Sequence, residues 1–387
     1  MNPASASRTI PITRPNIGPE ELEAVAAVLR SGWLVQGEQV RRFETLLSES
    51  SGVPHAIAVS SCTAALHLSL VACGIGPGDE VLVPALTYVA TANAVEQTGA
   101  RPVFVDIRLD SWNIDPDAWE ARITSKTRAV IPVHLFGRMA PMDRLMPWAE
   151  RRNLRVIEDA ACAIGARSGS RAAGSFGTSG CFSFHPRKVI TTGEGGAIVT
   201  ADGTLAERLR QLRSHGESRS DWSRHGDQSA RLPQFGLAGY NYRMTDFQAA
   251  LGAVQMKRLP ALLEARLRLA RRYAEGLRGV PGLETPAIPE GEVHPFQSYV
   301  IRITPAARCS RDELAEQLKG EGIATRQGTH AVHALDYYAR KYGFRPEDFP
   351  NAWTADQESL TLPLYPALSA ADQDQVIETI RKELSAR

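Results

Sequence analysis

Two kinds of hydrophobic pattern alternate along the first two-thirds of the chain. Short apolar runs typical of buried strands lie at residues 56–59, 80–83, 102–106, 128–133, 154–158 and 180–184. Between them, apolar residues recur with helical spacing near residues 19–30, 63–73, 88–98 and 142–151. This alternation predicts an α/β fold with a mainly parallel sheet between helices, and ligands at the carboxyl ends of the strands.

A further helical pattern spans residues 260–277, with an apolar stripe that includes Leu263, Leu267 and Ala270. We interpret this helix as the link between two domains. The predicted division is a large ligand-binding domain with an N-terminal arm over residues 1–258, and a smaller C-terminal α+β domain over residues 259–387. The most loop-like stretch is 216–239, which is rich in Ser, Arg, Asp and Gly.

The segment from Cys181 to Gly196, CFSFHPRKVITTGEGG, places a single lysine, Lys188, between an apolar run and a glycine-rich turn. A lysine ammonium is rarely left in apolar surroundings without a partner. A neutral amine that has condensed with an aldehyde can remain there as an imine. The pattern therefore indicates a Schiff-base lysine, and the aldehyde that it suggests is pyridoxal 5'-phosphate (PLP).

Asp159 ends a strand-like run 29 positions before Lys188, in the sequence LRVIEDAACAIG. An acidic residue partners the pyridinium nitrogen in PLP enzymes and keeps the ring protonated as an electron sink. Taken alone, an aspartate at the end of a strand is more often a helix cap or a turn former. The lysine segment reverses that preference, and we predict that Lys188 and Asp159 are the catalytic pair.

A third segment, AIAVSSCTAALHLSL from Ala56 to Leu70, joins an apolar strand to a helix through small hydroxylated residues. The first turn of a helix offers unpaired backbone N–H groups and the positive end of the helix dipole, which favour a phosphate dianion. The expected donors are the amides around Thr63 and Ala64, helped by the hydroxyl of Ser61 or Thr63. An ordinary N-cap without a ligand would have the same sequence.

Composition narrows the class of protein. The chain has 387 residues, 43% apolar and 22% charged, and a formal charge of +1, which gives no bulk attraction to nucleic acid or to an anionic membrane. Five cysteines without C-x-x-C spacing indicate a reducing cytoplasm rather than a disulfide or zinc framework. No apolar run approaches the ~18 residues of a membrane span, and no signal-peptide pattern is seen, so we expect a soluble cytoplasmic protein.

Several blocks of the chain resemble, in the same order, the DegT/StrS group of PLP-dependent nucleotide-sugar aminotransferases, of the fold-type-I (aspartate aminotransferase) superfamily. Besides the three segments above, the blocks are TRPNIG from Thr13, SGWL from Ser31, VPALTYVATAN from Val83, IPVHLFG from Ile131, YNYRMTDFQAA from Tyr240 and LPLYP from Leu362. The resemblance covers nearly the whole chain. It implies a fold-type-I PLP transferase that acts in amino sugar or polysaccharide biosynthesis.

The resemblance also implies roles for single residues. Tyr88 matches the aromatic residue that stacks on the cofactor ring, although a core tyrosine would look the same. Ser183 matches a serine that reaches the phosphate. Asn241 matches an asparagine that reaches the phosphate from the neighbouring subunit, which implies a homodimer with shared active sites.

The chain departs from the family pattern at two cysteines. Cys162 stands where the family often has glutamine or histidine, three residues after Asp159. Because a thiol is a weak hydrogen-bond donor, the contact that the longer residue makes to the cofactor is weakened or replaced, and sensitivity to oxidation is expected. Cys62 stands where many relatives have glycine, but only backbone amides are needed at that point.

By resemblance, the expected reaction moves the amino group of L-glutamate to a nucleotide-linked keto sugar, at C4 of a 4-keto-6-deoxyhexose. The alternatives are amination at C3 or of a keto-cyclitol, a PLP-dependent sugar dehydratase, and a regulator that senses PLP or a sugar. Lys188 argues against the dehydratases, which carry histidine at that position. Candidate substrate residues are Trp33, Glu194, Arg326 and His330.

Two other kinds of site are disfavoured. The glycine-rich turn from Thr192 to Gly196 lacks both G-x-G-x-x-G and G-K-[ST], which argues against a dinucleotide or P-loop site. His330 and His333 have no clustered third ligand in the sequence, so we expect no metal site.

Overall fold

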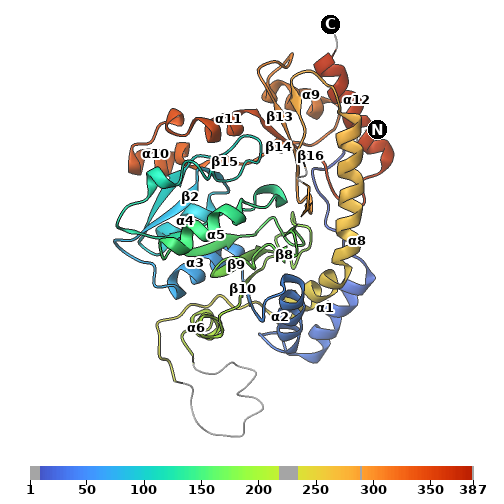
Figure 1. Cartoon of the computed structure of the whole chain (residues 1–387). Coiled ribbons are helices and arrows are strands. Elements are labelled where there is room, and N and C mark those ends of the chain that lie inside the picture. Colours follow the sequence, from blue (N-terminus) through green and yellow to red (C-terminus); the bar gives the residue numbers. More distant parts are fainter. Residues whose placement is uncertain (1–8, 218–233, 288–289, 386–387) are drawn as a thin grey trace.

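The computed structural model describes residues 9–217, 234–287 and 290–385 (Figure 1). Most of the predicted loop at 216–239 lies outside the described residues. Within the described ranges, no helix has the length and apolar character that a membrane crossing requires.

A seven-stranded sheet forms the centre of the molecule, in the order β1-β10-β9-β6-β5-β2-β4. Its strands in chain order are β1 (His55–Val59), β2 (Glu80–Pro84), β4 (Arg101–Val105), β5 (Thr127–Val130), β6 (Arg155–Asp159), β9 (Ser179–Ser183) and β10 (Gly196–Thr200). β10 is antiparallel to both of its neighbours, whereas the other adjacent strands pair in parallel. The six predicted strands and the mainly parallel sheet are confirmed, and β10 is an addition.

Alternating side chains of the strands supply two hydrophobic cores, one on each face of the sheet. In β2, Val81 and Val83 join one core and Leu82 joins the other. The first core is covered by α3 (Cys62–Ala72), α4 (Ala90–Gln97) and α6 (Gly203–Arg213). The second is covered by α2 (Glu38–Ser51), α5 (Met142–Arg151) and the start of α8 (Asp246–Gly276). Burial on both faces explains why the strands are continuously apolar.

The predicted helices at 19–30, 63–73, 88–98 and 142–151 are confirmed as α1 (Pro19–Ser31), α3, α4 and α5. The helix predicted at 260–277 is the carboxyl half of α8, which begins 14 residues earlier than expected, at Asp246. Figure 1 shows α8 running along one side of the molecule. Its first part packs against α1 and α2, and Ala270 and Tyr273 in its last part join a third core.

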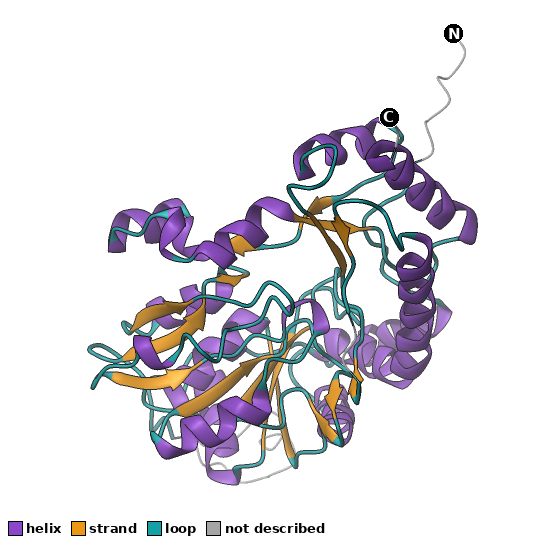
Figure 2. Cartoon of the chain, turned by 45° about the horizontal axis from the view of Figure 1, so that its top comes forward, coloured by secondary structure: helices purple, strands orange, loops and turns teal. Residues whose placement is uncertain are grey.

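That third core lies between a small antiparallel sheet and its helices (Figure 2). The strand order is β11-β13-β16-β14. The bounds are β11 (Leu283–Glu284), β13 (Tyr299–Ile303), β14 (Arg326–Gln327), β16 (Ser359–Leu362), with helices α9 (Arg311–Gly320) and α12 (Ala370–Ser385). This is the α+β arrangement expected of the C-terminal part.

The remaining short strands pair outside these two sheets. The short strands are β3 (Leu86–Thr87), β7 (Arg167–Ser168), β8 (Arg171–Ala172), β12 (Glu292–Val293) and β15 (His330–Ala331), and the further helices are α10 (Asp336–Tyr342) and α11 (Pro350–Glu358). β15 pairs with β3, and α11 packs on the core of the large sheet. The division at residue 258 stays a prediction: α8 runs through it, and the segment from β15 to α11 lies against the large sheet.

Candidate active site

Lys188 lies in the loop that joins β9 to β10, beyond the carboxyl end of β9. Backbone hydrogen bonds within the loop hold it in place. The amide of Lys188 donates to the carbonyl of His185 over 2.8 Å, and the amide of Phe184 donates to the carbonyl of Gly195 over 2.9 Å. The side chain of Lys188 turns inward, and its Nζ donates to Sγ of Cys162 over 3.1 Å. The structure thus brings together Lys188 and the residue three positions after Asp159.

The charge state of Lys188 reflects opposing effects. Burial lowers the pKa of the Lys188 amine, but the contact with Cys162 and the negative charge of Asp159 oppose it, and the net pKa is raised above its ordinary value. Burial, reinforced by Asp159, raises the pKa of the Cys62 thiol well above its usual range. Cys62 is therefore a neutral thiol at physiological pH. A neutral side chain is compatible with the expectation that only the backbone amide of Cys62 is needed.

Asp159 is the last residue of β6, and its carboxylate is held by two donors. Thr91 Oγ1 donates to Oδ2 over 2.8 Å, and the amide of Ala161 donates to Oδ1 over 3.1 Å. Asp159 is only 6% exposed. A buried carboxylate fixed by two hydrogen bonds at a strand end is suited to hold one protonated ring nitrogen.

Thr91 is a site residue that the sequence reasoning missed. It lies in the first turn of α4, is fully buried, and its hydroxyl is 3.0 Å from that of Thr87 at the end of β3. A hydroxyl that donates to Asp159 can accept from Thr87, so the three side chains form a chain of hydrogen bonds. The signal was present in the block from Val83, where two threonines stand four positions apart, but threonine pairs are too common to be selected without coordinates.

The expected phosphate cradle has a defined shape at the start of α3. Ser61 is the N-cap residue, and its Oγ accepts from the amide of Ala64 over 3.1 Å. The amide of Ala64 is therefore used by the cap, and the amides of Cys62 and Thr63 are the donors left at this helix end. An ordinary N-cap that binds no ligand would have the same geometry. The phosphate site at these residues therefore stays a prediction.

The backbone of Gly196 passes very close to the start of α3. A Cβ on Gly196 would lie 2.5 Å from the backbone nitrogen of Cys62, so only glycine allows β10 to pass so close to the helix. Gly196 pairs with Ser183 across the β9–β10 ladder. Ser183 therefore lies beside the start of α3, as a serine that reaches a phosphate would. Gly193, with φ +82°, occupies the left-handed region within the same turn.

The residues expected at the outer face of the site come from two elements that pair with each other. Tyr88 follows β3, is 65% exposed, and accepts a hydrogen bond through its carbonyl from the amide of Thr91 over 3.1 Å. His330 pairs with Thr87 in the β3–β15 ladder. The C-terminal part of the chain thus contributes His330 next to Tyr88, far from it in sequence.

Glu194 and Trp33 both lie near the start of α8. The carbonyl of Glu194 accepts from Gln248 Nε2 over 2.9 Å. Trp33 Nε1 donates to the carbonyl of Gln36 over 3.4 Å, and the amide of Asp246 donates to the carbonyl of Leu34 over 3.1 Å. The glycine-rich turn and the loop after α1 therefore meet at one helix end.

Asn241 is exposed and pairs through its backbone with Ser214 in an isolated bridge. The carbonyl of the next residue, Tyr242, accepts from the amide of Ser60 over 2.8 Å, just before the α3 cradle. No contact joins Asn241 to Lys188 or Asp159 within the described chain. Its exposed side chain is available to a neighbouring subunit, as the dimer hypothesis requires.

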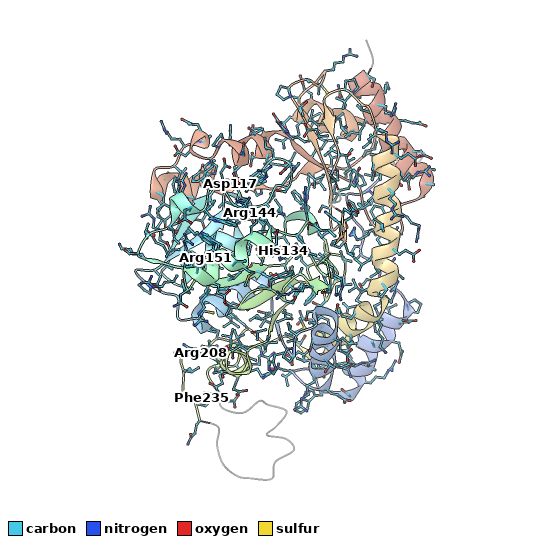
Figure 3. All side chains as sticks on the ribbon, in the orientation of Figure 1. Asp117, His134, Arg144, Arg151, Arg208 and Phe235 are labelled. Carbon is cyan, nitrogen blue, oxygen red and sulfur yellow. The ribbon has the colours of Figure 1, made fainter. Side chains whose placement is uncertain are left out.

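A buried pair behind Asp159 was also missed from the sequence. Glu158 and His134 are fully buried, with His134 Nε2 2.9 Å from Glu158 Oε2, and Figure 3 shows His134 in the interior. His134 Nδ1 accepts from the amide of Ala140 over 3.0 Å, so Nε2 carries the proton and donates to Glu158. Glu158 also accepts from three backbone amides, those of Gly174, Phe176 and Gly177. This network fixes the end of β6 and hence Asp159.

The residues present fit PLP. The combination is a buried amine at Lys188, a carboxylate at Asp159 that is oriented for one donor, and a helix start that Gly196 keeps free of a Cβ. All three groups lie at the carboxyl ends of β9, β6 and β1 in one mainly parallel sheet. When bound, PLP supplies the electron sink that stabilises negative charge on the carbon next to the reacting amine.

Comparison with known proteins identifies the family of the chain. The chain belongs to the DegT/DnrJ/EryC1/StrS aminotransferase family, which matches residues 15–381. It is therefore a PLP-dependent sugar aminotransferase of fold type I, and the resemblance noted in the sequence is confirmed. It is 41% identical over 374 residues to the spore coat polysaccharide biosynthesis protein SpsC of Bacillus subtilis strain 168, covering 96% of each chain.

Solved structures give the same result. The PLP form of the putative sugar aminotransferase Spr1654 from Streptococcus pneumoniae superimposes with a TM-score of 0.89 at 31% identity, covering 97% of this chain and 98% of that one. DesV of S. venezuelae, solved in complex with a ketimine intermediate, gives a TM-score of 0.86 at 36% identity over 95% of each chain. The predicted fold class and cofactor are thus confirmed.

Proposed function

We propose that the enzyme transfers the amino group of L-glutamate to a nucleotide-linked keto sugar, at C4 of a 4-keto-6-deoxyhexose. The observation that carries the transamination is the inward-turned Lys188 amine, 3.1 Å from Cys162 and in the same cluster as Asp159. Support for a sugar acceptor comes from the relatives, one a polysaccharide biosynthesis protein and one a putative sugar aminotransferase.

In this proposal each residue of the site has one task. Lys188 would hold the cofactor, and its amine would move the proton at Cα of the donor. Asp159 pairs with the ring nitrogen, and Thr91 fixes the direction of its carboxylate. Tyr88 covers the face of the ring.

Other residues hold the phosphate and complete the site. The amides of Cys62 and Thr63 at the start of α3 hold the phosphate together with Ser183, and the amide of Ala64 stays on the Ser61 cap. Asn241 of a second copy of the chain completes the phosphate site, so the active unit is a homodimer. Trp33, Glu194 and His330 are proposed to line the sugar side of the site, and the enzyme is proposed to work in the cytoplasm.

The test is a product analysis. PLP-loaded enzyme is incubated with L-glutamate and a nucleotide 4-keto-6-deoxyhexose, and mass spectrometry is used to find the amino sugar and an equal amount of 2-oxoglutarate. A deoxygenated keto product would identify a dehydratase instead. Amination of a 3-keto sugar or a keto-cyclitol, with no product from the 4-keto sugar, would keep the transaminase and replace the acceptor. No turnover with any acceptor, despite PLP and sugar binding, would favour a sensing role.

A further inference from the structure

The contact between Lys188 and Cys162 places an amine directly against a thiol. Lys188 Nζ lies 3.1 Å from Cys162 Sγ, and both side chains are half-buried, so a small solute can reach them. A neutral lysine amine is a nucleophile, and a cysteine sulfur accepts a nucleophile once an oxidant has converted it to a sulfenic acid. The two atoms are therefore placed to form a covalent bond with each other.

The backbone on both sides of this contact is fixed. The amide of Ala160 donates to the carbonyl of Cys181 over 2.9 Å, which ties the turn that carries Cys162 to the neighbouring strand β9. The amide of Lys188 is held by the carbonyl of His185 within its own loop. The sulfur and the nitrogen are therefore kept opposite each other by the two loops.

The other four cysteines lie in surroundings that favour the thiol. Burial raises the pKa of these thiols, which are Cys62, Cys73, Cys181 and Cys309. Cys181 is hydrogen-bonded to the hydroxyl of Ser69 over 3.4 Å. Cys162 is bonded to an amine instead, and a neighbouring cation stabilises the thiolate, which is the form that oxidants attack. Oxidation is therefore expected to begin at Cys162.

Oxidation of the sulfur also changes the charge of the amine. Burial lowers the pKa of the Lys188 amine, and the contact with Cys162 is the main influence that raises it. A sulfenic acid is neutral, so its formation removes most of that opposition, and burial then favours the neutral amine. The neutral amine is the form that attacks sulfur. Oxidation of Cys162 therefore prepares Lys188 to react with it.

We propose that a peroxide links Lys188 Nζ to Cys162 Sγ as a sulfenamide. In the first step the Cys162 thiol is oxidised by two electrons and hydrogen peroxide is reduced, which gives the sulfenic acid and one water. In the second step the N–S bond forms as the S–O bond breaks, and the hydroxyl leaves as water with a proton from the nitrogen. One thiol, one amine and one hydrogen peroxide thus give one sulfenamide and two waters.

The link blocks loading with PLP in a reversible way. The nitrogen of a sulfenamide is no longer a primary amine, so it does not form an imine with an aldehyde. A small thiol displaces the nitrogen and leaves a mixed disulfide on Cys162, and a second thiol molecule then releases the cysteine. The link depends on neither the amino donor nor the sugar acceptor, so it stands apart from the proposed function. Glutamine or histidine, which the family often has in place of Cys162, offers no sulfur to oxidise.

The test is peptide mapping of the full-length protein after treatment with hydrogen peroxide. One sample is first dialysed with hydroxylamine to remove PLP, and a second sample is kept loaded with PLP. Proteolysis without reductant should give, in the first sample, the Cys162 and Lys188 peptides joined, with a mass two hydrogen atoms below their sum. Dithiothreitol should restore the separate peptides and, in the same proportion, covalent loading with PLP, followed by visible absorbance.

The PLP-loaded sample separates this link from the role of Lys188 in the reaction. The cofactor occupies the same nitrogen in the proposed function, so the linked peptide should be absent from this sample. A link that forms equally in both samples would show that Lys188 does not carry the cofactor, and it would still support the bond between Lys188 and Cys162.

Three variants identify the reacting atoms. Cys162→Ser keeps a hydrogen-bond acceptor for Lys188 but cannot be oxidised in this way, so the linked peptide should be lost. Lys188→Arg keeps the positive charge beside the sulfur, but a guanidinium stays protonated and does not attack. The Cys162 sulfenic acid should therefore accumulate in this variant and be trapped by dimedone. Cys309→Ala, at a partly exposed cysteine, is the control and should form the link as the unmodified protein does.

Two results would overturn the proposal. One is oxidation of Cys162 as far as the sulfinic acid, in the sample without PLP, with no linked peptide. The other is a disulfide between Cys62 and Cys162 in place of the link to Lys188, which Cys62→Ala would abolish.

Discussion

The side-chain amine of Lys188 donates a hydrogen bond to the sulfur of Cys162, and this contact keeps the pKa of Lys188 above its ordinary value although burial lowers it. Lys188 and Cys162 lie 26 positions apart in the sequence, on loops that follow β9 and β6. The cysteine that departs from the family pattern therefore acts directly on the lysine.

Cys162→Ala is expected to lower the pKa of Lys188, because burial remains and the opposing contact is lost. A lower pKa leaves more of the amine neutral at a given pH, so covalent loading with PLP should speed up toward lower pH. The measurement is the rate of reconstitution, followed by visible absorbance across pH. Cys309→Ala, at a partly exposed cysteine outside the site, is the control, and an unchanged or upward-shifted profile would contradict the assignment.

Lys188→Ala is expected to abolish both the borohydride-reducible PLP adduct and turnover, because Lys188 supplies the amine that turns into the site beside Cys162. Lys126→Ala, on the loop before β5, should leave both intact. Purified protein is examined by absorbance and by mass spectrometry after reduction. A reducible adduct and full turnover in Lys188→Ala would show that another residue carries the cofactor.

Asp159→Asn is expected to lower turnover much more than stability, because loss of the charge lets the ring nitrogen deprotonate.

Thr91→Val should act in the same direction more weakly, by about 10- to 100-fold in kcat, as removal of a residue that orients a functional ligand often does. Since the hydroxyl of Thr91 is bonded to Asp159 and Thr87, KM for the sugar should stay unchanged, and Thr91→Ser should recover most of kcat. Equal kcat in Thr91→Val and the unmodified enzyme would remove Thr91 from the site.

The shared active site can be examined by mixing subunits. Lys188→Ala and Asn241→Ala chains, each inactive or nearly so, are expected to regain activity together, because one site of each heterodimer receives both intact residues. Subunit exchange is verified by native mass spectrometry. A fully active monomer in analytical ultracentrifugation would refute the dimer.

His294 gives an expected pH dependence of stability. Burial, reinforced by the charge of Arg138, lowers the pKa of His294 to about 4, so the folded state keeps the imidazole neutral while the unfolded chain binds a proton below ~6.5. Stability from this group is therefore complete above pH 6.5 and is lost as the pH falls toward 4, by about 2 kcal/mol at pH 5.

Asn in place of His294 can still accept the hydrogen bond from the amide of Phe296, which is 2.9 Å long, but it cannot titrate. His294→Asn should therefore lose less stability than the unmodified protein between pH 7 and pH 5 in urea unfolding. His55→Asn, at a partly exposed position, is the control. An identical pH response in all three proteins would show that His294 is not buried neutral.

The sequence by itself determined the fold class and the family, and it predicted Lys188 and Asp159 as the catalytic pair. Apolar strands that alternate with amphipathic helices predicted the parallel sheet, because burial on both faces leaves a local pattern. Lys188 and Asp159 could be selected from the sequence because a lysine beside apolar residues, together with an acid at a strand end, is chemically unusual. The resemblance then supplied the expected roles of Tyr88 and Ser183.

Only the tertiary structure decided which distant side chains meet. Thr91 meets Asp159, Cys162 meets Lys188, and Arg326 of β14 lines one cavity with Arg187. These segments share no local signal, because each contact depends on how strands are ordered in the sheet and how the small sheet lies against it. The antiparallel strand β10 could not be predicted from the local pattern either. Its pairing depends on the glycine-rich turn before it and on Gly196, which passes α3 without a Cβ. The local pattern of apolar and polar residues determines which segments form helices and strands. Contacts between distant segments depend on how those helices and strands pack together, which the sequence of one segment does not specify.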